Sequence, residues 1–236
     1  MKVYTDLHIH SALSPCSDNE MTPNNIVNMA FLKQLDIIAV TDHNSAENCI
    51  AVAECAKKRG VVAVPGMELE TREEVHLVCL FPGIDEALSM QEIVYNALPD
   101  IKNREDIFGE QIVMDARDNV LRHVDRLLLT ASNLGIDDVF GHVGALGGVV
   151  IPAHVDRDSY SIISNLGVVP ENPEIKYLEI SKMCDKKAYL DKNPYLRRFN
   201  FIRSSDAHSL GDILEREITI ELEEVSIECL IETLRK

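Results

Sequence analysis

The sequence is poor in basic residues and lacks any long apolar run. Its 23 Lys and Arg stand against 39 Asp and Glu, which gives a formal net charge of −16. A long nucleic-acid footprint needs clustered basic side chains, so this charge argues against such a partner and against an anionic membrane surface. It is compatible with a small anionic substrate, because bound metal ions can reverse the local charge.

Signal-peptide and disulfide patterns are also missing. No segment reaches membrane-spanning length and the N-terminus has no apolar signal core, so we expect a cytoplasmic protein. The six cysteines are scattered without a CxxC pair, and we interpret them as free or buried thiols in a reducing compartment. A length of 236 residues with 46% hydrophobic content suits one large domain, or a domain with an insertion.

Short apolar segments alternate with segments that have helix caps or helical periodicity. Strands are predicted at 3–8, 36–41, 61–64, 75–81, 149–153, 177–181 and 201–204, with a peripheral one at 217–221. Helices are predicted at 22–34, 45–59, 136–146 and 158–165, and after Ser226. The alternation favours parallel βα units and therefore an α/β fold, a closed or distorted barrel with its chemistry at the carboxyl ends of the strands.

The alternation breaks between about residues 82 and 135. This stretch is polar with a mostly helical pattern, and residues 120–134 are predicted to form an amphipathic helix. Its apolar face would contain Val120, Val124, Leu127, Leu128, Ala131 and Leu134. We therefore expect a single domain over residues 1–236, with a mostly helical insertion at about 82–135.

Side chains that ligate metals cluster at the ends of the predicted strands. A strand alternates its side chains, so His8 and His10 point to the same side. Further N and O donors follow from other strands and loops: Asp18, His43, Glu68, His76, His154, Asp206 and His208. These nine donors exceed the four to six positions of one ion, so we predict two or three divalent ions, with Glu68 as a bridge. Imidazole and carboxylate suit Zn, Mn and Fe alike.

Several nearby residues allow two interpretations. Asp6 and Asp42 either orient a ligand imidazole or cap a strand end. Four cations lie near strand ends, namely Arg72, Arg157, Lys182 and Arg203. Arg157 is the best candidate for a phosphate contact, although an ion pair with Asp156, Asp158 or a more distant acid fits equally well. His123 and His142 fall within predicted helices and are not assigned to the site.

The segments DLHIHSALSPCSD, AVTDHN, PGMELE, the His76 segment, IPAH and SSDAH resemble, in order and spacing, the motifs of the PHP (polymerase and histidinol phosphatase) superfamily. The resemblance implies a distorted TIM-like (β/α)7 barrel, a trinuclear metal centre and phosphoesterase activity. It assigns His8, His10, Glu68 and Asp206 to one metal. It assigns Glu68, His76 and His154 to a second metal, and Asp18, His43 and His208 to a third. Asp18 stands where some members of the superfamily have His.

These observations lead to a hypothesis about function. The protein is expected to hydrolyse a small phosphate monoester (a nucleotide, a nucleoside bisphosphate, or a sugar or amino-alcohol phosphate) by attack of a metal-bound hydroxide. His43 or His208 would protonate the leaving oxygen, and Arg157 would hold the phosphate. One alternative is an amidohydrolase-type metal hydrolase, which also begins with an HxH pair. Another is a non-catalytic regulatory domain that retains the metal site.

Overall fold

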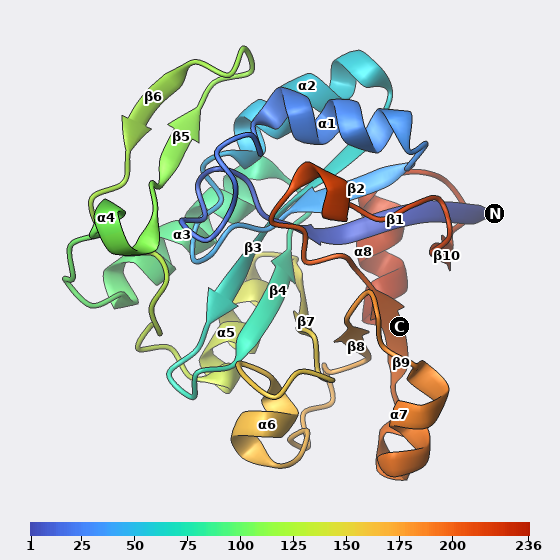
Figure 1. Cartoon of the computed structure of the whole chain (residues 1–236). Helices are drawn as coiled ribbons and strands as arrows, with labels where there is room; N and C mark the ends of the chain where they lie inside the picture. The colour runs from blue at the N-terminus through green and yellow to red at the C-terminus, as the bar shows by residue number, and fades with distance from the viewer.

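The structure is a computed structural model that describes all 236 residues. Its main sheet contains six strands, β1 (Lys2–Ile9), β2 (Ile37–Val40), β3 (Val62–Glu70), β4 (His76–Leu80), β7 (Val149–Pro152) and β10 (Thr219–Glu221). The strand order is β10-β1-β2-β3-β4-β7, and the sheet curls into half a barrel (Figure 1). Two further pairs are β5 (Ile112–Met114) with β6 (Val120–His123), and β8 (Tyr177–Ile180) with β9 (Asn200–Arg203).

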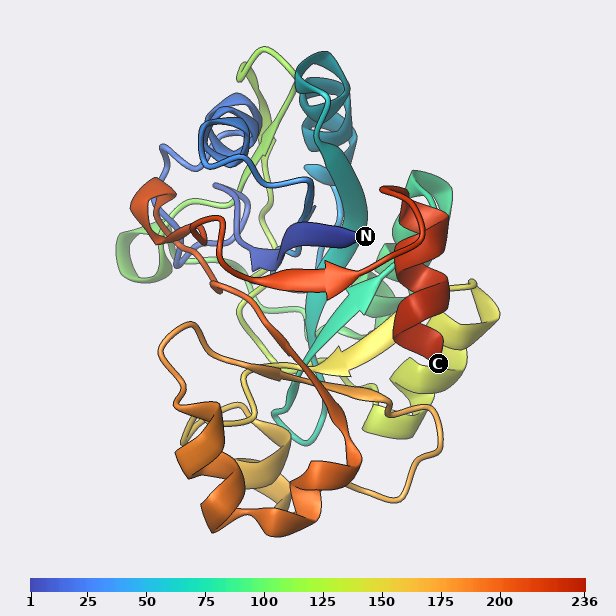
Figure 2. The same ribbon diagram turned by 90° about the vertical axis from the view of Figure 1, so that its right-hand side faces the viewer.

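Eight α-helices complete the fold and cover both faces of the sheet. They are α1 (Pro23–Leu32), α2 (Cys49–Arg59), α3 (Ile84–Ala97), α4 (Glu105–Phe108), α5 (Ile136–Ala145), α6 (Ile162–Leu166), α7 (Lys186–Lys192) and α8 (Ile227–Arg235). The apolar faces of α1 and α2 pack on one side of β1 and β2, whereas α8 packs on the other side. Figure 2 shows α8 against the sheet near the N-terminus. None of these helices combines the length and apolar character that crossing a membrane requires.

Local signals in the sequence predict most of these elements well. Thr22 caps α1 by accepting the N–H of Asn25, with Pro23 in the first turn, and Gly60 ends α2 with a left-handed φ of 70°. Ser226 caps α8 in the same way as Thr22 caps α1. The expected start of α2 at Ser45 is wrong by a few residues, because the Ser45 hydroxyl bonds to Gln91 and the helix begins at Cys49. The helix expected from residue 158 likewise begins only at residue 162.

The expectation of parallel strands throughout is wrong at β4, and at the edge strand β10, which runs antiparallel to β1. β1, β2 and β3 are parallel, but β4 runs antiparallel to both β3 and β7. The connection from β3 to β4 is a short turn in which Thr71 and Val75 are hydrogen-bonded. A parallel pair needs a crossover of about a dozen residues, which this turn cannot provide. The α/β class is confirmed in this mixed form. β8 lies beside β7, and the chain after β9 reaches β1 through one bridge between Ile9 and Ala207 (Figure 2).

The helix predicted at residues 120–134 is wrong. The segment begins with strand β6, and no helix follows it before α5. Val124 and Leu128 are nevertheless buried, and the buried Gln111 side chain satisfies main-chain groups that a helix would have paired. Gln111 donates to the carbonyls of Val124 and Arg126 and accepts from the N–H of Leu128, all at 2.8 Å. The stretch at 82–135 is therefore helical in its first half and a β-hairpin with irregular backbone in its second (Figure 1).

Candidate metal centre

The two histidines at the end of β1 face one another, as their spacing predicts. His8 and His10 are fully buried, and their Nε2 atoms lie 3.2 Å apart. Each ring is fixed through its other nitrogen. Nδ1 of His8 lies 2.9 Å from Oε2 of Glu179, and Nδ1 of His10 lies 2.9 Å from the Ser14 hydroxyl. Both Nε2 atoms are therefore directed towards the same point.

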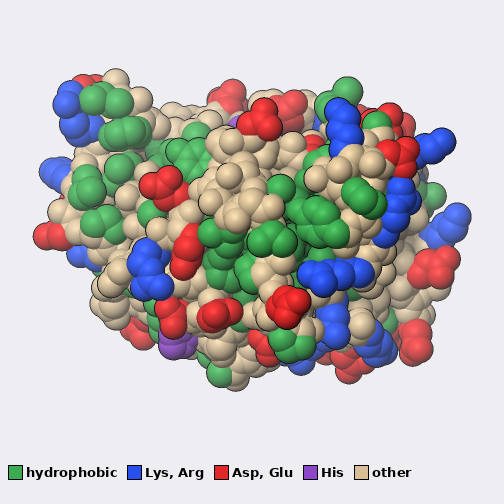
Figure 3. All heavy atoms as spheres, turned by 90° about the horizontal axis from the view of Figure 1, so that it is seen from below, with side chains coloured by type: hydrophobic (Ala, Val, Ile, Leu, Met, Phe, Trp, Pro, Cys, Tyr) green, Lys and Arg blue, Asp and Glu red, His purple; other side chains and the backbone are tan.

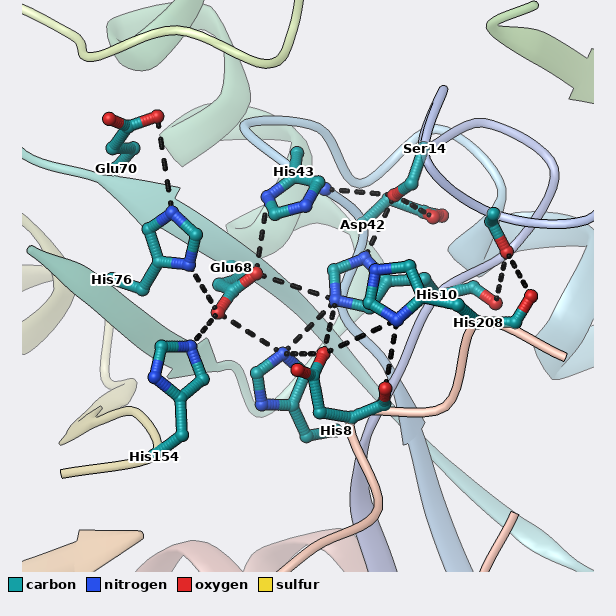
Figure 4. A network of polar contacts seen from close by, with 12 residues as sticks. His8, His10, Ser14, Asp42, His43, Glu68, Glu70, His76, His154 and His208 are labelled. Carbon is teal, nitrogen blue, oxygen red and sulfur yellow. Dashed lines mark hydrogen bonds and ion pairs between the residues drawn. The ribbon is translucent and has the colours of Figure 1, made fainter. Parts of the chain in front are cut away.

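Glu68 on β3 is the centre of the cluster (Figure 4). Its Oε1 lies 2.9 Å from Nδ1 of His76 and 3.2 Å from Nε2 of His154. Its Oε2 lies 3.1 Å from Nδ1 of His43. Nitrogens of His8 and His10 follow at 3.3 and 3.4 Å. Five imidazoles from four separate parts of the chain thus surround one carboxylate.

Asp206 and its neighbours close the side of the cluster next to β1. Oδ1 of Asp206 lies 3.0 Å from Nε2 of His10, and Oδ2 lies 2.6 Å from the Arg157 guanidinium. His208 stacks on His10, with ring centroids 4.3 Å apart, and its Nδ1 donates to the main-chain carbonyl of Asp206 at 2.8 Å. The backbones of Asp206 and His154 have left-handed φ angles of 52° and 29°. Strain of this kind costs on the order of 1–3 kcal/mol per residue and persists where the surrounding structure enforces it.

The donor atoms form three buried groups that could each hold a metal ion. One consists of His8, His10, Glu68 and Asp206, the set that the superfamily resemblance assigns to a single metal. The other two differ in membership from the implied sets: His43, Glu68 and His76 lie together, as do His10, His43 and His208. His154 belongs to none of the three groups, but its Nε2 lies 3.2 Å from Oε1 of Glu68. A fourth group, Glu105, Glu110 and His123, is largely exposed on the segment between α3 and α5.

Asp18 does not join any of these groups. Its carboxylate is exposed and accepts the N–H of Glu20 at 2.9 Å. Its main-chain N–H donates to the carbonyl of His208, also at 2.9 Å, so the residue lies next to the cluster. Its role as a third-metal ligand stays a prediction.

The charges of the cluster fit bound cations. Burial raises the pKa of Glu68, but His76, His8 and His43 outweigh this effect and hold the pKa well below its usual range. Burial lowers the pKa of His10, but Asp206 and Glu68 outweigh it and raise the pKa to about 9. Without metal, protons on His8 and His10 therefore compensate the carboxylates. Nδ1 of His154 and Nε2 of His76 are buried without a hydrogen-bond partner. Such a set of orphaned nitrogens and paired carboxylates suits divalent ions.

Asp42 and Asp6 support the site indirectly. Asp42 accepts the hydroxyl protons of Ser14 and Ser11 at 2.7 and 2.6 Å. Because the Ser14 proton goes to Asp42, Nδ1 of His10 must donate to Ser14, which fixes the His10 tautomer. Asp6 contacts no imidazole and instead accepts the N–H groups of Ser205 and Leu214, each at 2.9 Å.

Sequence reasoning did not identify Glu179. This residue is almost fully buried on β8, and its Oε2 accepts from both His8 Nδ1 and the main-chain N–H of His154. One carboxylate thus fixes two members of the cluster. The sequence did contain an indication of its role, because Glu179 is the only charged residue in the strand Tyr177–Ile180. A charged residue in a buried strand needs a partner.

Arg157 is the one candidate cation that reaches the cluster. Arg203 bonds to main-chain carbonyls, Lys182 bonds to the carbonyl of Asp212, and Arg72 lies beside Glu73. Arg157 pairs with Asp206, the more distant acid of the alternative interpretation, and its side chain stays 44% exposed. His123 and His142 lie outside the main cluster, as expected, and all six cysteines are free thiols.

Comparisons with known proteins agree with the resemblance. The PHP domain family model matches residues 6–182. A 3′,5′-nucleoside bisphosphate phosphatase from Chromobacterium violaceum is 34% identical over 85 residues, which cover 35% of this chain and 28% of that protein. The matches span 57% and 28% of the first two curated relatives, so this chain covers less than two thirds of either.

Solved structures share the fold at lower identity. The lesion-specific endonuclease Q from Pyrococcus furiosus superposes with a TM-score of 0.69 and 20% identity, over 100% of this chain and 56% of that one. A protein from Bifidobacterium adolescentis, described as a metal-dependent phosphoesterase, gives a TM-score of 0.64 and 16% identity over 97% and 96% of the two chains. At these identities the similarity establishes the fold. The family match extends over well more than half of the sequence, and the chain therefore belongs to the PHP domain family.

Proposed function

We propose that this protein is a metal-dependent phosphoesterase that hydrolyses a small phosphate monoester, such as a nucleotide, a nucleoside bisphosphate, or a sugar or amino-alcohol phosphate. The observation that carries the proposal is the position of Glu68, which is buried among five imidazoles and shares a donor group with a second carboxylate, Asp206, whose side chain is 6% exposed. Buried carboxylates are costly unless cationic groups compensate them, so the cluster is best explained as a site for cations.

The donor set would hold two or three divalent ions, with Zn, Mn and Fe as candidates. When bound, such ions acidify a water molecule and bind the oxygens of a phosphoryl group. Glu68 is central to two of the three groups and is our candidate for the bridging carboxylate. Glu179 and Ser14 orient His8 and His10 so that their Nε2 atoms face the donor group that would hold an ion.

Arg157 is our candidate for a direct contact with the substrate phosphate. One of its nitrogens pairs with Asp206, and the 44% exposed side chain leaves further N–H donors accessible to a phosphate oxygen. Planar guanidinium groups match the geometry of phosphate oxygens. The ion pair with Asp206 therefore positions a phosphate contact at the edge of the cluster.

Protonation of the leaving oxygen by His43 or His208 stays a prediction. Burial and the neighbouring His10 lower the pKa of both imidazoles, that of His43 well below its ordinary value. A neutral imidazole is the form that ligates metals, so the metal-free protein favours the ligand role for both residues. His208 is the more exposed of the two and is the better placed to meet a substrate.

The charge of the protein indicates the size of its substrate. On the face seen in Figure 3, many basic side chains gather towards the right-hand side, with acidic side chains among them. The net charge of −16 nevertheless favours a small phosphate ester over a long nucleic acid. The structure of endonuclease Q with a 27-mer duplex is known, so the expected absence of a nucleic-acid substrate needs a direct test.

The experiment restores Mn, Fe or Zn to metal-free protein and measures metal content and hydrolysis together. The panel contains adenosine 5′-monophosphate, a nucleoside 3′,5′-bisphosphate, ribose 5-phosphate, a phosphodiester, a DNA duplex with an abasic site, a lactone and an amide. We expect at least two ions per chain and metal-dependent hydrolysis of phosphomonoesters. Hydrolysis of only the lactone or amide would establish the amidohydrolase alternative. A metal-loaded protein that hydrolyses no substrate of the panel would establish the alternative of a non-catalytic regulatory domain.

A further inference from the structure

Tyr160 is an aromatic residue that lies at the edge of the metal centre without being buried. Its ring is stacked on His76, with centroids 4.8 Å apart and an angle of 20° between the planes. The residue is nevertheless 45% exposed. No other aromatic ring and no cation stacks on it. One face of the ring is therefore occupied by a candidate ligand, and the rest of the ring is accessible.

The backbone at Tyr160 is held in an unfavourable conformation. Its φ angle is 54°, in the left-handed region that glycine and asparagine adopt more easily than tyrosine. The carbonyl of Tyr160 accepts the N–H of His76 at 2.9 Å, which ties this conformation to the first residue of β4. Ser161 caps α6 directly afterwards. A strained aromatic residue next to a site is a reason to ask what its ring contacts.

The same loop also contains Arg157. The Arg157 N–H donates to the carbonyl of His154 at 2.9 Å, and the Ser161 hydroxyl donates to the carbonyl of Arg157 at 2.8 Å. Arg157 reaches the cluster on the side of Asp206, whereas Tyr160 reaches it on the side of His76. Glu68 lies between these two sides. A single loop, held by these hydrogen bonds, thus places one cation and one aromatic ring at two edges of the centre.

We propose that Tyr160 is a specificity residue that stacks on a planar ring in the leaving group of the substrate. This inference rests on the proposed phosphoesterase function and narrows it to phosphate esters that carry a nucleobase or a similar ring. A phosphate held at the centre with Arg157 leaves the remainder of a nucleotide to extend over the imidazole of His76 towards Tyr160. Stacking of a base on an aromatic side chain typically changes affinity by about 10-fold or more.

The test compares two substrates that differ only in the base, adenosine 5′-monophosphate and ribose 5-phosphate. The ratio of their kcat/KM values is measured for the metal-loaded wild type, Tyr160→Ala and Tyr160→Phe. We expect Tyr160→Ala to lower the ratio by about 10-fold, and Tyr160→Phe, which keeps the ring, to restore most of it. Adenosine as a competitive inhibitor should bind more weakly to Tyr160→Ala by a similar factor.

The matched control is Tyr195→Ala, which removes another half-exposed tyrosine that stacks on no residue of the centre and should leave the ratio unchanged. Metal content is measured for every variant. If Tyr160→Ala slows both substrates equally, or changes neither, the ring only supports His76 or is idle, and the inference is overturned. Absence of phosphoester hydrolysis in the wild type would instead refute the proposed function, so the two failures are distinguishable.

Discussion

The carboxylate of Glu179 lies 2.9 Å from Nδ1 of His8, and the same oxygen accepts the main-chain N–H of His154 at 3.0 Å. These contacts join β8 to β1 and to the end of β7, three segments that are far apart in the sequence. A carboxylate in this position fixes the tautomer of a ligand imidazole and increases its basicity.

We expect Glu179→Gln to lower metal affinity by about 10- to 100-fold, the range typical for partners of ligand imidazoles. The amide can still accept the His154 N–H, but it lacks the negative charge that His8 meets. Titration with a competing chelator measures the change. The exposed Glu232→Gln on α8 is the control. Unchanged metal affinity in Glu179→Gln would show that the carboxylate serves the fold alone.

Arg157 should matter for the substrate more than for the metal. We expect Arg157→Ala to lower kcat/KM for phosphate esters by roughly 10- to 100-fold, the size of one charge-assisted hydrogen bond, with little loss of metal. Arg157→Lys should recover only part of this, because an ammonium group lacks the planar donor pair. Arg197→Ala, which breaks an exposed ion pair with Asp191, is the control. Metal loss without a kinetic effect would contradict the phosphate role.

Asp18 provides a test of the third metal position. Its carboxylate is exposed, so in a loaded protein it would have to turn from the Glu20 N–H towards His208 to bind an ion. We expect Asp18→Asn to weaken the binding of one ion while the ions around Glu68 are retained. Elemental analysis across a metal titration gives the number of ions per chain. Identical binding curves for variant and wild type would remove Asp18 from the ligand set.

The stability of the metal-free protein should fall as the pH rises from about 6.5 to 9. The pKa of His10 is raised from 6.5 to about 9, and that of His8 is raised well above its ordinary value by Glu179, Glu68 and Asp206 despite burial. A raised pKa adds stability that is complete below the unfolded pKa and lost as the pH passes the folded one. The lowered pKa values of His43 and His208 act in the opposite sense and only below about 6.5.

Urea unfolding in chelator at pH 6.5, 7.5, 8.5 and 9.5 measures this trend. His10→Gln should reduce the slope, because it removes one of the two titrating groups. Added Mn should reverse the trend, since metal ions compete with the same protons and bind more tightly at higher pH. A metal-free stability that is constant or rises over this range would contradict the assigned protonation of His8 and His10.

Local rules were sufficient to predict most elements and the chemical identity of the centre. The alternation of β1 alone aligns His8 with His10, and the caps at Thr22 and Ser226 fix where α1 and α8 begin. A ligand side chain at the end of a short apolar strand is placed by that strand, so its position follows from the strand pattern. The sequence therefore determined which residue types meet in an α/β fold and that they would suit divalent cations.

Only the tertiary structure decided how these residues combine. The antiparallel β4 brings His76 to Glu68, and the buried Gln111 replaces a predicted helix because its amide satisfies the backbone of Val124 and Leu128. Glu179 meets His8 across 171 positions of sequence. Such contacts depend on side chains that satisfy buried polar groups over long sequence distances, and no local periodicity encodes them.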